Sequence, residues 1–256
     1  GVAYGMSVSK EGRTYPIRND TFEIPTGAEA LAEGERLYIA RGCGDCHAVD
    51  GGGRTIMDDA PARVSGTNLT RATDGWDASD WSRAVRYGLR ADGHALVFMP
   101  SHEYHTMTDR ELGAIAAYIA TLPDSSTSLP PNEIRMLGRV IDLAGGFPLF
   151  PASLIDHAGD RPHVPDPAPT AEYGAYLAVG CTGCHGAQLS GGAIPGAPPE
   201  LGVPRNLTFH ESGLAGWSEA DLRAALREGR TPDGGTLNPD QMPWRVMSSF
   251  LSDDEV

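Results

Sequence analysis

The chain has 256 residues, of which 34 are acidic and 20 are basic, so its formal net charge is −14. This acidic balance argues against binding to nucleic acid and favours partners that present a basic face. Aromatic residues are scarce at 7%, whereas the sequence contains 32 glycines and 20 prolines. This composition suits two small domains built from short helices and long loops.

Residues 1–25 are expected to form an N-terminal arm. The sequence begins with Gly1 rather than methionine, so we expect a segment upstream of it, and Gly1 to Met6 could be the tail of a signal or anchor segment. No run in the sequence approaches the roughly 20 apolar residues that a helix needs to span a bilayer.

The first predicted helix runs from Ala28 to Ala40. Leu31, Leu37 and Tyr38 are apolar at helical spacing within it. The helix leads directly into a short motif of two cysteines and a histidine.

Two C-x-x-C-H motifs, Cys43-Gly-Asp-Cys46-His47 and Cys181-Thr-Gly-Cys184-His185, contain all four cysteines of the chain. If each motif opens a helix, residues three and four apart lie on one face. The two thiols can then meet the two vinyl groups of a haem while the imidazole reaches the iron. We therefore predict two covalently bound haem c groups, attached through the four cysteines and ligated by His47 and His185. A four-thiolate zinc site or a thioredoxin-like redox pair would explain the cysteines but not the histidines.

The sequence around the two motifs repeats itself. Asn68-Leu69-Thr70 matches Asn206-Leu207-Thr208 at an offset of 138 residues, and Met99-Pro100 matches Met242-Pro243 at 143. Self-similarity at such a long period indicates two copies of one domain. We place these domains at residues 26–124 and 170–256. At about 100 residues each, a protein core alone is marginal, and a buried porphyrin would add the missing apolar centre.

Two more helices are predicted in the first copy, each opened by a capping sequence. One follows Asp77-Ala-Ser-Asp80, and its counterpart in the second copy follows Ser218-Glu-Ala-Asp221. The other begins at Thr108-Asp-Arg-Glu111. The second copy repeats this last box as Ser252-Asp-Asp-Glu255, immediately before the end of the sequence. We therefore expect the natural chain to continue and to complete the closing helix.

The repeat also selects the sixth ligand of each iron. The donors available in the first copy are Met99, Met107, His94, His102 and His105. Only Met99 has a counterpart that can bind iron, Met242, and the proline after each methionine removes an amide donor and stiffens the loop. We predict Met99 and Met242 as the distal ligands. Bis-histidine ligation of the first haem is the alternative.

Further roles around the haems are predicted from recurring residues. A ligating imidazole normally donates its second N–H to an acceptor. Pro61 and Pro199, each 14 residues after its histidine, are predicted to supply the carbonyl, with an ordinary loop proline as the alternative. The other recurring polar and aromatic residues could contact haem propionates or stabilise the fold, and they are Asn68, Asn206, Trp76, Trp217, Arg86 and Arg227.

The segment between the two copies, residues 125–169, is rich in proline. A helical period runs through Ile134, Leu137, Val140 and Ile141. The run Phe147-Pro-Leu-Phe150-Pro that follows is strongly apolar. We expect the segment to pack between the two domains and to fix their relative placement. The alternative is a patch that docks on a partner subunit.

The haem motif, the following proline, the Asn-Leu-Thr segment, the Gly-Trp helix start and the Met-Pro pair make the chain similar to tandem class I c-type cytochromes. The resemblance covers roughly residues 26–256. It extends to diheme and triheme subunits of membrane-bound dehydrogenases and to the diheme subunit of some haem-copper oxidases. It implies an all-α fold of two tandem class I cytochrome c domains, each made of a few short helices wrapped around one covalent haem.

The resemblance also implies a place outside the cytoplasm, on the periplasmic side of a bacterial membrane. Since His and Met would close both coordination sites of each iron, no position is open for a substrate, and we predict electron transfer rather than catalysis. The expected partners are redox proteins: a dehydrogenase, a quinol-oxidising complex, an oxidase or a photosynthetic reaction centre. The alternative is a diheme peroxidase, in which one haem lacks its sixth ligand.

Overall fold

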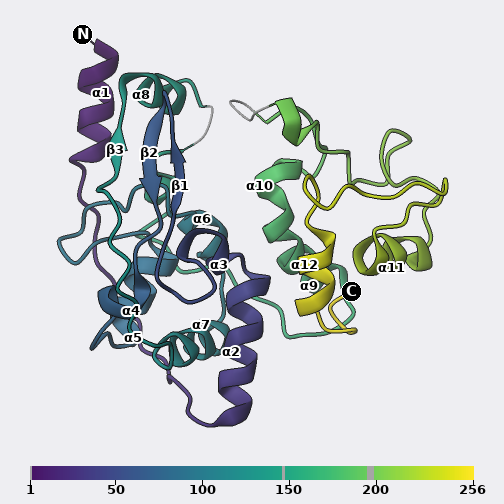
Figure 1. Cartoon of the computed structure of the whole chain (residues 1–256), viewed down its shortest axis with the longest axis horizontal. Coiled ribbons are helices and arrows are strands. Elements are labelled where there is room, and N and C mark those ends of the chain that lie inside the picture. The colour runs from purple at the N-terminus through teal and green to yellow at the C-terminus, as the bar shows by residue number, and fades with distance from the viewer. Residues whose placement is uncertain (1, 146–147, 195–198) are drawn as a thin grey trace. The chain divides into compact units, whose positions relative to one another are not determined.

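The computed structural model describes residues 2–145, 148–194 and 199–256, and it consists of two compact units, Gly1–His163 and Val164–Val256 (Figure 1). Each unit contains one C-x-x-C-H motif and one Met-Pro pair. Most of the proline-rich segment between the two sequence repeats therefore belongs to the first unit.

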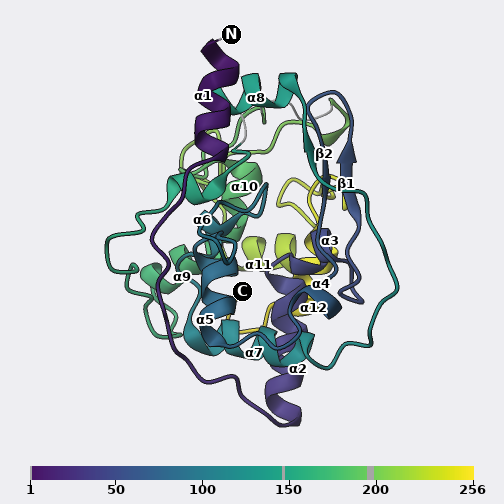
Figure 2. The ribbon, with the colours of Figure 1, turned by 90° about the vertical axis from the view of Figure 1, so that its left-hand side faces the viewer.

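The first unit is built mainly from short helices. They are α1 (Val2–Glu11), α2 (Ala28–Ala40), α3 (Cys43–His47), α4 (Leu69–Ala72), α5 (Ala78–Trp81), the π-helical turn η1 (Ser82–Arg86), α6 (Ser101–Tyr104), α7 (Asp109–Ile119), α8 (Met136–Leu143) and the 3-10 turn η2 (Pro151–Leu154). Helix α2 has the predicted bounds, and α8 forms within the predicted helical period. Helix α1, which lies beside α8 (Figure 2), has no counterpart among the predicted elements.

The second unit repeats part of this order. Its elements are α9 (Ala171–Leu177), η3 (Ala178–Cys181), α10 (Thr182–His185), η4 (Pro199–Leu201), α11 (Glu219–Glu228) and α12 (Trp244–Phe250). Helix α9 leads into the second motif, which begins at the end of η3 and fills α10, as α2 leads into the first motif in α3.

The core of the first unit lies where α2 crosses α7. Gly34 permits the close approach, because a Cβ atom there would stand 2.1 Å from the carbonyl oxygen of Ala114. The buried side chains of this core are Leu37, Tyr38, Trp81, Met107, Leu112, Ala114, Ile115, Ala116 and Ile119. The crossing therefore fixes the helix that leads into the first motif against the helix that closes the domain.

The first unit is not all-α as predicted, because it also contains a three-stranded antiparallel sheet. Strands β1 (Thr55–Asp58) and β2 (Ala62–Ser65) pair with each other, and β3 (Glu133–Ile134) pairs with β2. In β2 the side chains of Ala62 and Val64 are buried and those of Arg63 and Ser65 are partly exposed, which is the alternation expected of a strand with one covered face. The third strand comes from the proline-rich segment, so local sequence patterns could not reveal the pairing.

The end of the proline-rich segment is anchored on α7. Arg161 donates to the Met107 carbonyl at 3.1 Å and to Asp109 Oδ1 at 3.0 Å. Leu149 and Phe150 of the predicted apolar run are fully buried, and Phe147 of the same run lies outside the described residues. The segment thus forms part of the first unit rather than a free tether.

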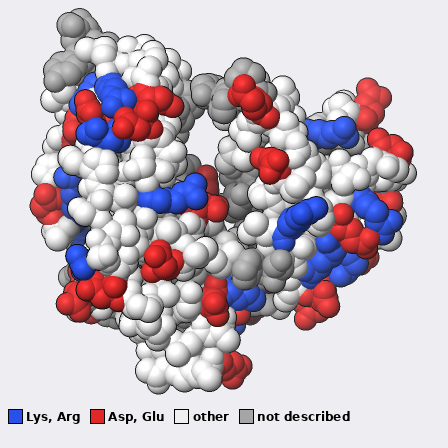
Figure 3. All heavy atoms as spheres, in the orientation of Figure 1, with Lys and Arg blue, Asp and Glu red and all other residues white. Residues whose placement is uncertain are grey.

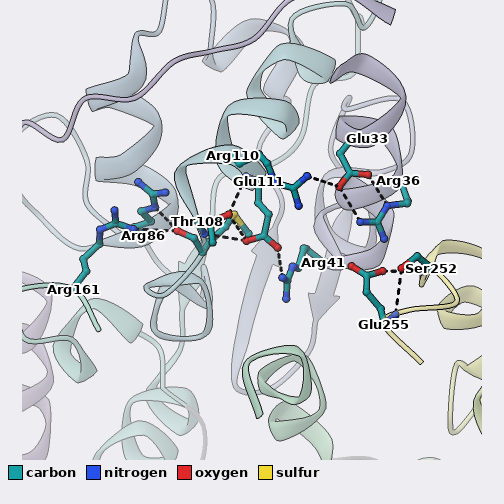
Figure 4. Close-up of polar contacts among 11 residues, drawn as sticks. Glu33, Arg36, Arg41, Arg86, Thr108, Arg110, Glu111, Arg161, Ser252 and Glu255 are labelled. Atoms are coloured by element: carbon teal, nitrogen blue, oxygen red, sulfur yellow. Dashed lines mark hydrogen bonds and ion pairs between the residues drawn. The ribbon is translucent and has the colours of Figure 1, made fainter. Parts of the chain in front are cut away.

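Three of the four predicted capping boxes are formed at helix starts. In each, the cap side chain accepts an N–H three residues on while the acidic side chain accepts the N–H of the cap residue: Asp77 with Asp80, Thr108 with Glu111, and Ser218 with Asp221. Ser252 and Glu255 exchange the same two bonds, at 2.8 and 3.3 Å. Figure 4 shows Glu111 between Thr108 and Arg41, with which it also forms an ion pair.

Replacing Thr108 by alanine should lower the free energy of unfolding of the first unit by about 1 kcal/mol, because the Glu111 N–H loses its acceptor at 3.2 Å. Denaturant unfolding of the haem-loaded chain measures the change. Thr108→Ser keeps a hydroxyl in place and serves as the control. Equal stabilities of the alanine and serine variants would contradict a capping role.

Candidate haem sites

The first motif forms a short helix, α3, that starts after a sharp turn. Gly42 supplies this turn with a left-handed φ of 72°. Tyr38, fully buried, donates its hydroxyl proton to the Ala48 carbonyl at 2.6 Å. The turn and this bond fix both ends of the motif against α2. Cys43, Cys46 and His47 consequently occupy helical positions three and four apart, as the attachment chemistry requires.

Both motif histidines are oriented by a backbone carbonyl. His47 Nδ1 lies 2.8 Å from the Thr67 oxygen, and His185 Nδ1 lies 2.7 Å from the Arg205 oxygen. A carbonyl can only accept, so Nδ1 carries the proton and Nε2 keeps its lone pair for a metal. The prediction that Pro61 supplies the carbonyl in the first copy was wrong, as was the prediction of Pro199 in the second.

The true acceptors occupy equivalent places, each directly before the recurring Asn-Leu-Thr segment. Asn68 Oδ1 accepts from the N–H and the hydroxyl of Thr70, at 3.1 and 2.7 Å. Asn206 Oδ1 makes the same two bonds with Thr208, at 2.8 and 2.7 Å. These turns hold the preceding residue in place and explain why the segment recurs. The repeated Asn-Leu-Thr segment was visible in the sequence. The sequence did not show that the carbonyl directly before this segment accepts the Nδ1 proton of the motif histidine.

Two cavities of about 340 and 360 Å³ adjoin His47 in the first unit. His47, Thr67, Arg90, Leu96 and Met99 line both of them, whereas Cys46 lines one and Cys43 lines the other. Their volumes are those of ordinary cofactor sites. His47 and Met99 border both cavities, and each cavity has one cysteine thiol on its wall. This lining fits a haem that is attached through its two vinyl groups.

The larger cavity has a strongly apolar wall. The side chains that form it include Trp76, Trp81, Leu112, Ile115 and Ile119. Loss of hydration raises the pKa of the Cys43 thiol to about 12 and raises that of Cys46. Burial also lowers the pKa of His47, more than the bond to Thr67 raises it. The imidazole is therefore neutral at pH 7 and able to bind a metal.

The two Met-Pro pairs form the same kind of turn. Ser101 donates its N–H to the Met99 carbonyl at 2.8 Å, and Trp244 donates to the Met242 carbonyl at 2.7 Å. Pro100 lies between them in the first copy with φ −78° and ψ 53°, the inverse γ-turn that the ring of proline favours. Of the donors weighed against Met99, the histidines His94, His102 and His105 line neither of the two cavities, whereas Met107 lines the larger one and is buried in the core.

In the second unit His185 is buried, Cys181 and Met242 are partly buried, and Cys184 is exposed. Burial raises the pKa of Cys181. Among the described residues, no three His, Cys, Asp or Glu side chains come together as a metal site would require.

The recurring arginines stabilise the fold. Arg86, labelled in Figure 4, is completely buried. It donates to the Met107 carbonyl at 2.9 Å and pairs with Asp109 at 2.7 Å. Arg227 likewise donates to the Leu251 carbonyl at 2.9 Å and to Asp253 at 2.8 Å. Each arginine therefore ties the second helix of its copy to the capping box that comes later in that copy, which starts at Thr108 in the first and at Ser252 in the second. The face drawn in Figure 3 carries acidic and basic side chains interspersed.

Residues 29–119 match the family model described as cytochrome c oxidase, cbb3-type, subunit III. The first unit contains a cytochrome c domain. Such a domain carries covalently attached haem c and transfers electrons.

Among the described residues, no helix has the length and apolar character needed to cross a membrane.

The chain is also similar to named relatives over most of its length. It is 27% identical to a diheme cytochrome c-type protein of Cereibacter sphaeroides, over 93% of this chain and 90% of the relative. It is 28% identical to a fructose dehydrogenase cytochrome subunit of Gluconobacter japonicus and 30% identical to a gluconate 2-dehydrogenase cytochrome c subunit of Pantoea cypripedii. These two matches span 84% and 88% of this chain, and 49% and 57% of the respective relatives. These names confirm the resemblance to diheme c-type cytochromes and to cytochrome subunits of dehydrogenases.

Proposed function

We propose that the chain is a diheme electron carrier with one haem in each of two cytochrome c domains, 26–124 and 170–256. Cys43 and Cys46 would hold the first haem, and Cys181 and Cys184 the second. His47 with Met99, and His185 with Met242, would ligate the two irons. Each haem, when bound, supplies a reversible one-electron couple at its iron.

The observation that carries this proposal is the matched orientation of His47 and His185. Each places Nδ1 on a backbone carbonyl 20 residues further along the chain, at 2.8 and 2.7 Å, and leaves Nε2 for a metal. Two unrelated histidines would not share a partner position, a turn sequence and a preceding C-x-x-C pair. The equivalence supports one chemistry in both copies.

We propose that the carrier takes electrons from a dehydrogenase and passes them to a respiratory or photosynthetic acceptor on the periplasmic side of the membrane. Two of the relatives are cytochrome subunits of dehydrogenases, which supports a subunit or docking partner of a larger redox complex. The net charge of −14 favours a basic docking face on the partner and disfavours nucleic acid.

Haem stoichiometry tests the two-site proposal. The purified chain should contain two haems that remain attached after denaturation, as measured by the pyridine haemochrome assay against protein concentration. Cys43→Ala/Cys46→Ala should reduce the content to one, and the matched variant Cys181→Ala/Cys184→Ala should do the same. A wild-type chain with one haem, or haem that separates on denaturation, would contradict the proposal.

The peroxidase alternative requires an open iron in at least one copy. A methionine on the Met-Pro turn of each copy argues against it. Carbon monoxide binds ferrous haem only where the sixth position is free, so the wild-type reduced protein should leave the gas unbound. Rapid binding of carbon monoxide or rapid reaction with peroxide would favour the enzyme instead.

A further inference from the structure

Phe98, the residue directly before Met99, has a backbone conformation that bulky residues avoid. Its φ is +64°, in the left-handed region, where a large side chain crowds its own backbone. A residue stays in such a conformation only when its surroundings impose it. The contacts of Phe98 therefore identify what holds the Met99 loop in place.

The contact on the Phe98 backbone comes from the proline-rich segment. The N–H of Phe98 donates to the carbonyl of Leu149 at 2.8 Å. Leu149 and its neighbour Phe150 are fully buried, in a cluster that includes Tyr87 and Leu89. The acceptor is thus part of a packed core and cannot follow the loop if the loop relaxes.

Leu149 is in turn held by α8. Its N–H donates to Asp142 Oδ1 at 3.0 Å, and Asp142 Oδ2 accepts from Lys10 of α1 at 2.9 Å. Asp142 is buried. A continuous set of bonds therefore leads from α1 through Asp142 and Leu149 to Phe98, the residue that precedes the methionine.

The second copy positions its methionine differently. Gln241 takes the place of Phe98, and among the described non-glycine residues only Ala48, Phe98 and Leu189 have a positive φ. Gln241 and Met242 both donate their N–H groups to the Asn238 carbonyl, at 3.1 and 2.9 Å. Met242 thus follows a turn within its own loop and an unstrained residue, and the Gln241 side chain also donates to the Glu200 carbonyl at 2.9 Å.

We infer that Asp142 and Leu149 are positioning residues for Met99, and that the segment between the two sequence repeats controls the sulfur ligand of the first haem but not that of the second. This inference rests on the proposed role of Met99. It makes two sites with the same ligand types inequivalent, because Met99 follows a strained residue held by the segment between the repeats and Met242 does not.

Two pairs of variants of the haem-loaded full chain test the inference. Asp142→Ala removes the acceptor for the Leu149 N–H, whereas Asp142→Asn keeps an acceptor oxygen and loses only the charge paired with Lys10. Phe98→Val disfavours the left-handed conformation because the side chain is β-branched, whereas Phe98→Gly adopts it freely. Gln241→Val is the matched change in the second copy. The readouts are the two reduction potentials and the binding of carbon monoxide by the reduced protein.

We expect Asp142→Ala and Phe98→Val to lower the potential of one haem and to let that haem bind carbon monoxide, while the other haem keeps both properties. The affected haem should be the one that Met99→Ala changes. Asp142→Asn, the destabilised Thr108→Ala and Gln241→Val should leave this haem unchanged. Phe98→Gly loses the same ring from the cavity wall as Phe98→Val but keeps the backbone conformation, so it should change the haem less than Phe98→Val does. If Phe98→Val does not fold, the two Asp142 variants decide.

The ligand role of Met99 and the positioning role of Asp142 and Leu149 can fail separately. If Met99→Ala alters one haem but Asp142→Ala and Phe98→Val alter neither, the positioning role is wrong and the ligand assignment stands. If Met99→Ala itself alters neither haem, the assignment of Met99 fails and the positioning role fails with it. An equal change of both haems in Asp142→Ala would also overturn the inference.

Discussion

Replacing Met99 by alanine should lower the reduction potential of one haem on the order of 0.1 V and open its iron, because a thioether in the sixth position stabilises the reduced state. Axial ligands and their surroundings spread haem potentials over roughly 0.8 V, so a shift of this size is well within their effect. Met242→Ala should do the same to the other haem. Spectroelectrochemical titration resolves the two midpoints.

The control for this prediction is a methionine outside the proposed sites. Met136 is 57% exposed on α8, so Met136→Ala removes a thioether without reaching either site. Its potentials should equal those of the wild type. Should Met99→Ala retain both potentials and leave carbon monoxide unbound, the first iron must take another ligand, and the three nearby histidines would return as candidates.

Local signals in the sequence predicted the helices well. The bounds of α2, the capping boxes at Asp77, Thr108 and Ser218, and the helix within the proline-rich segment depend on residues close together in the chain. Capping and helical periodicity act over three or four residues, so no knowledge of the fold is needed to recognise them.

Contacts between distant residues were not predictable in the same way. Strand β3 pairs with β2 across about 70 residues, and β3 comes from the proline-rich segment, which has no second copy to compare. The acceptor of His47 was sought at Pro61 because proline stiffens a turn, whereas the structure uses Thr67, which the Asn68 side chain holds in place. A side-chain turn can fix a carbonyl as firmly as a ring can, and composition does not show which carbonyl faces the imidazole.

The roles of the recurring arginines lie between these cases. Repetition marked Arg86 and Arg227 as important but left haem propionates and the fold as equal explanations. Their partners in the structure are repeated as well: each arginine binds the carbonyl directly before the box at Thr108 or Ser252 and the aspartate within that box. Since both partners recur with the arginine, the repeat conserves a complete structural contact within this chain.

Replacing Arg86 by alanine should therefore destabilise the first unit by about 2–4 kcal/mol, through the lost bond to Met107 and the space left in a packed interior. Arg86 is fully buried, and burial lowers its pKa, with the neighbouring Arg161 lowering it further and Asp109 opposing both. Arg161 still binds the Met107 carbonyl and Asp109, and Asp109 is 53% exposed, so neither partner is left without hydration or a donor. The cost is accordingly that of packing and one buried bond rather than of a stranded charge.

The matched change in the second copy should cost less. The Arg227 side chain is 19% exposed and its partner Asp253 is 91% exposed, so Arg227→Ala gives up contacts that water can replace, and we expect a loss of about 1 kcal/mol. Denaturant unfolding measures both variants, and reduction potentials measured in parallel should stay within error of the wild type. A shifted potential in Arg86→Ala at unchanged stability would instead indicate that the guanidinium acts on the haem, as the propionate alternative requires.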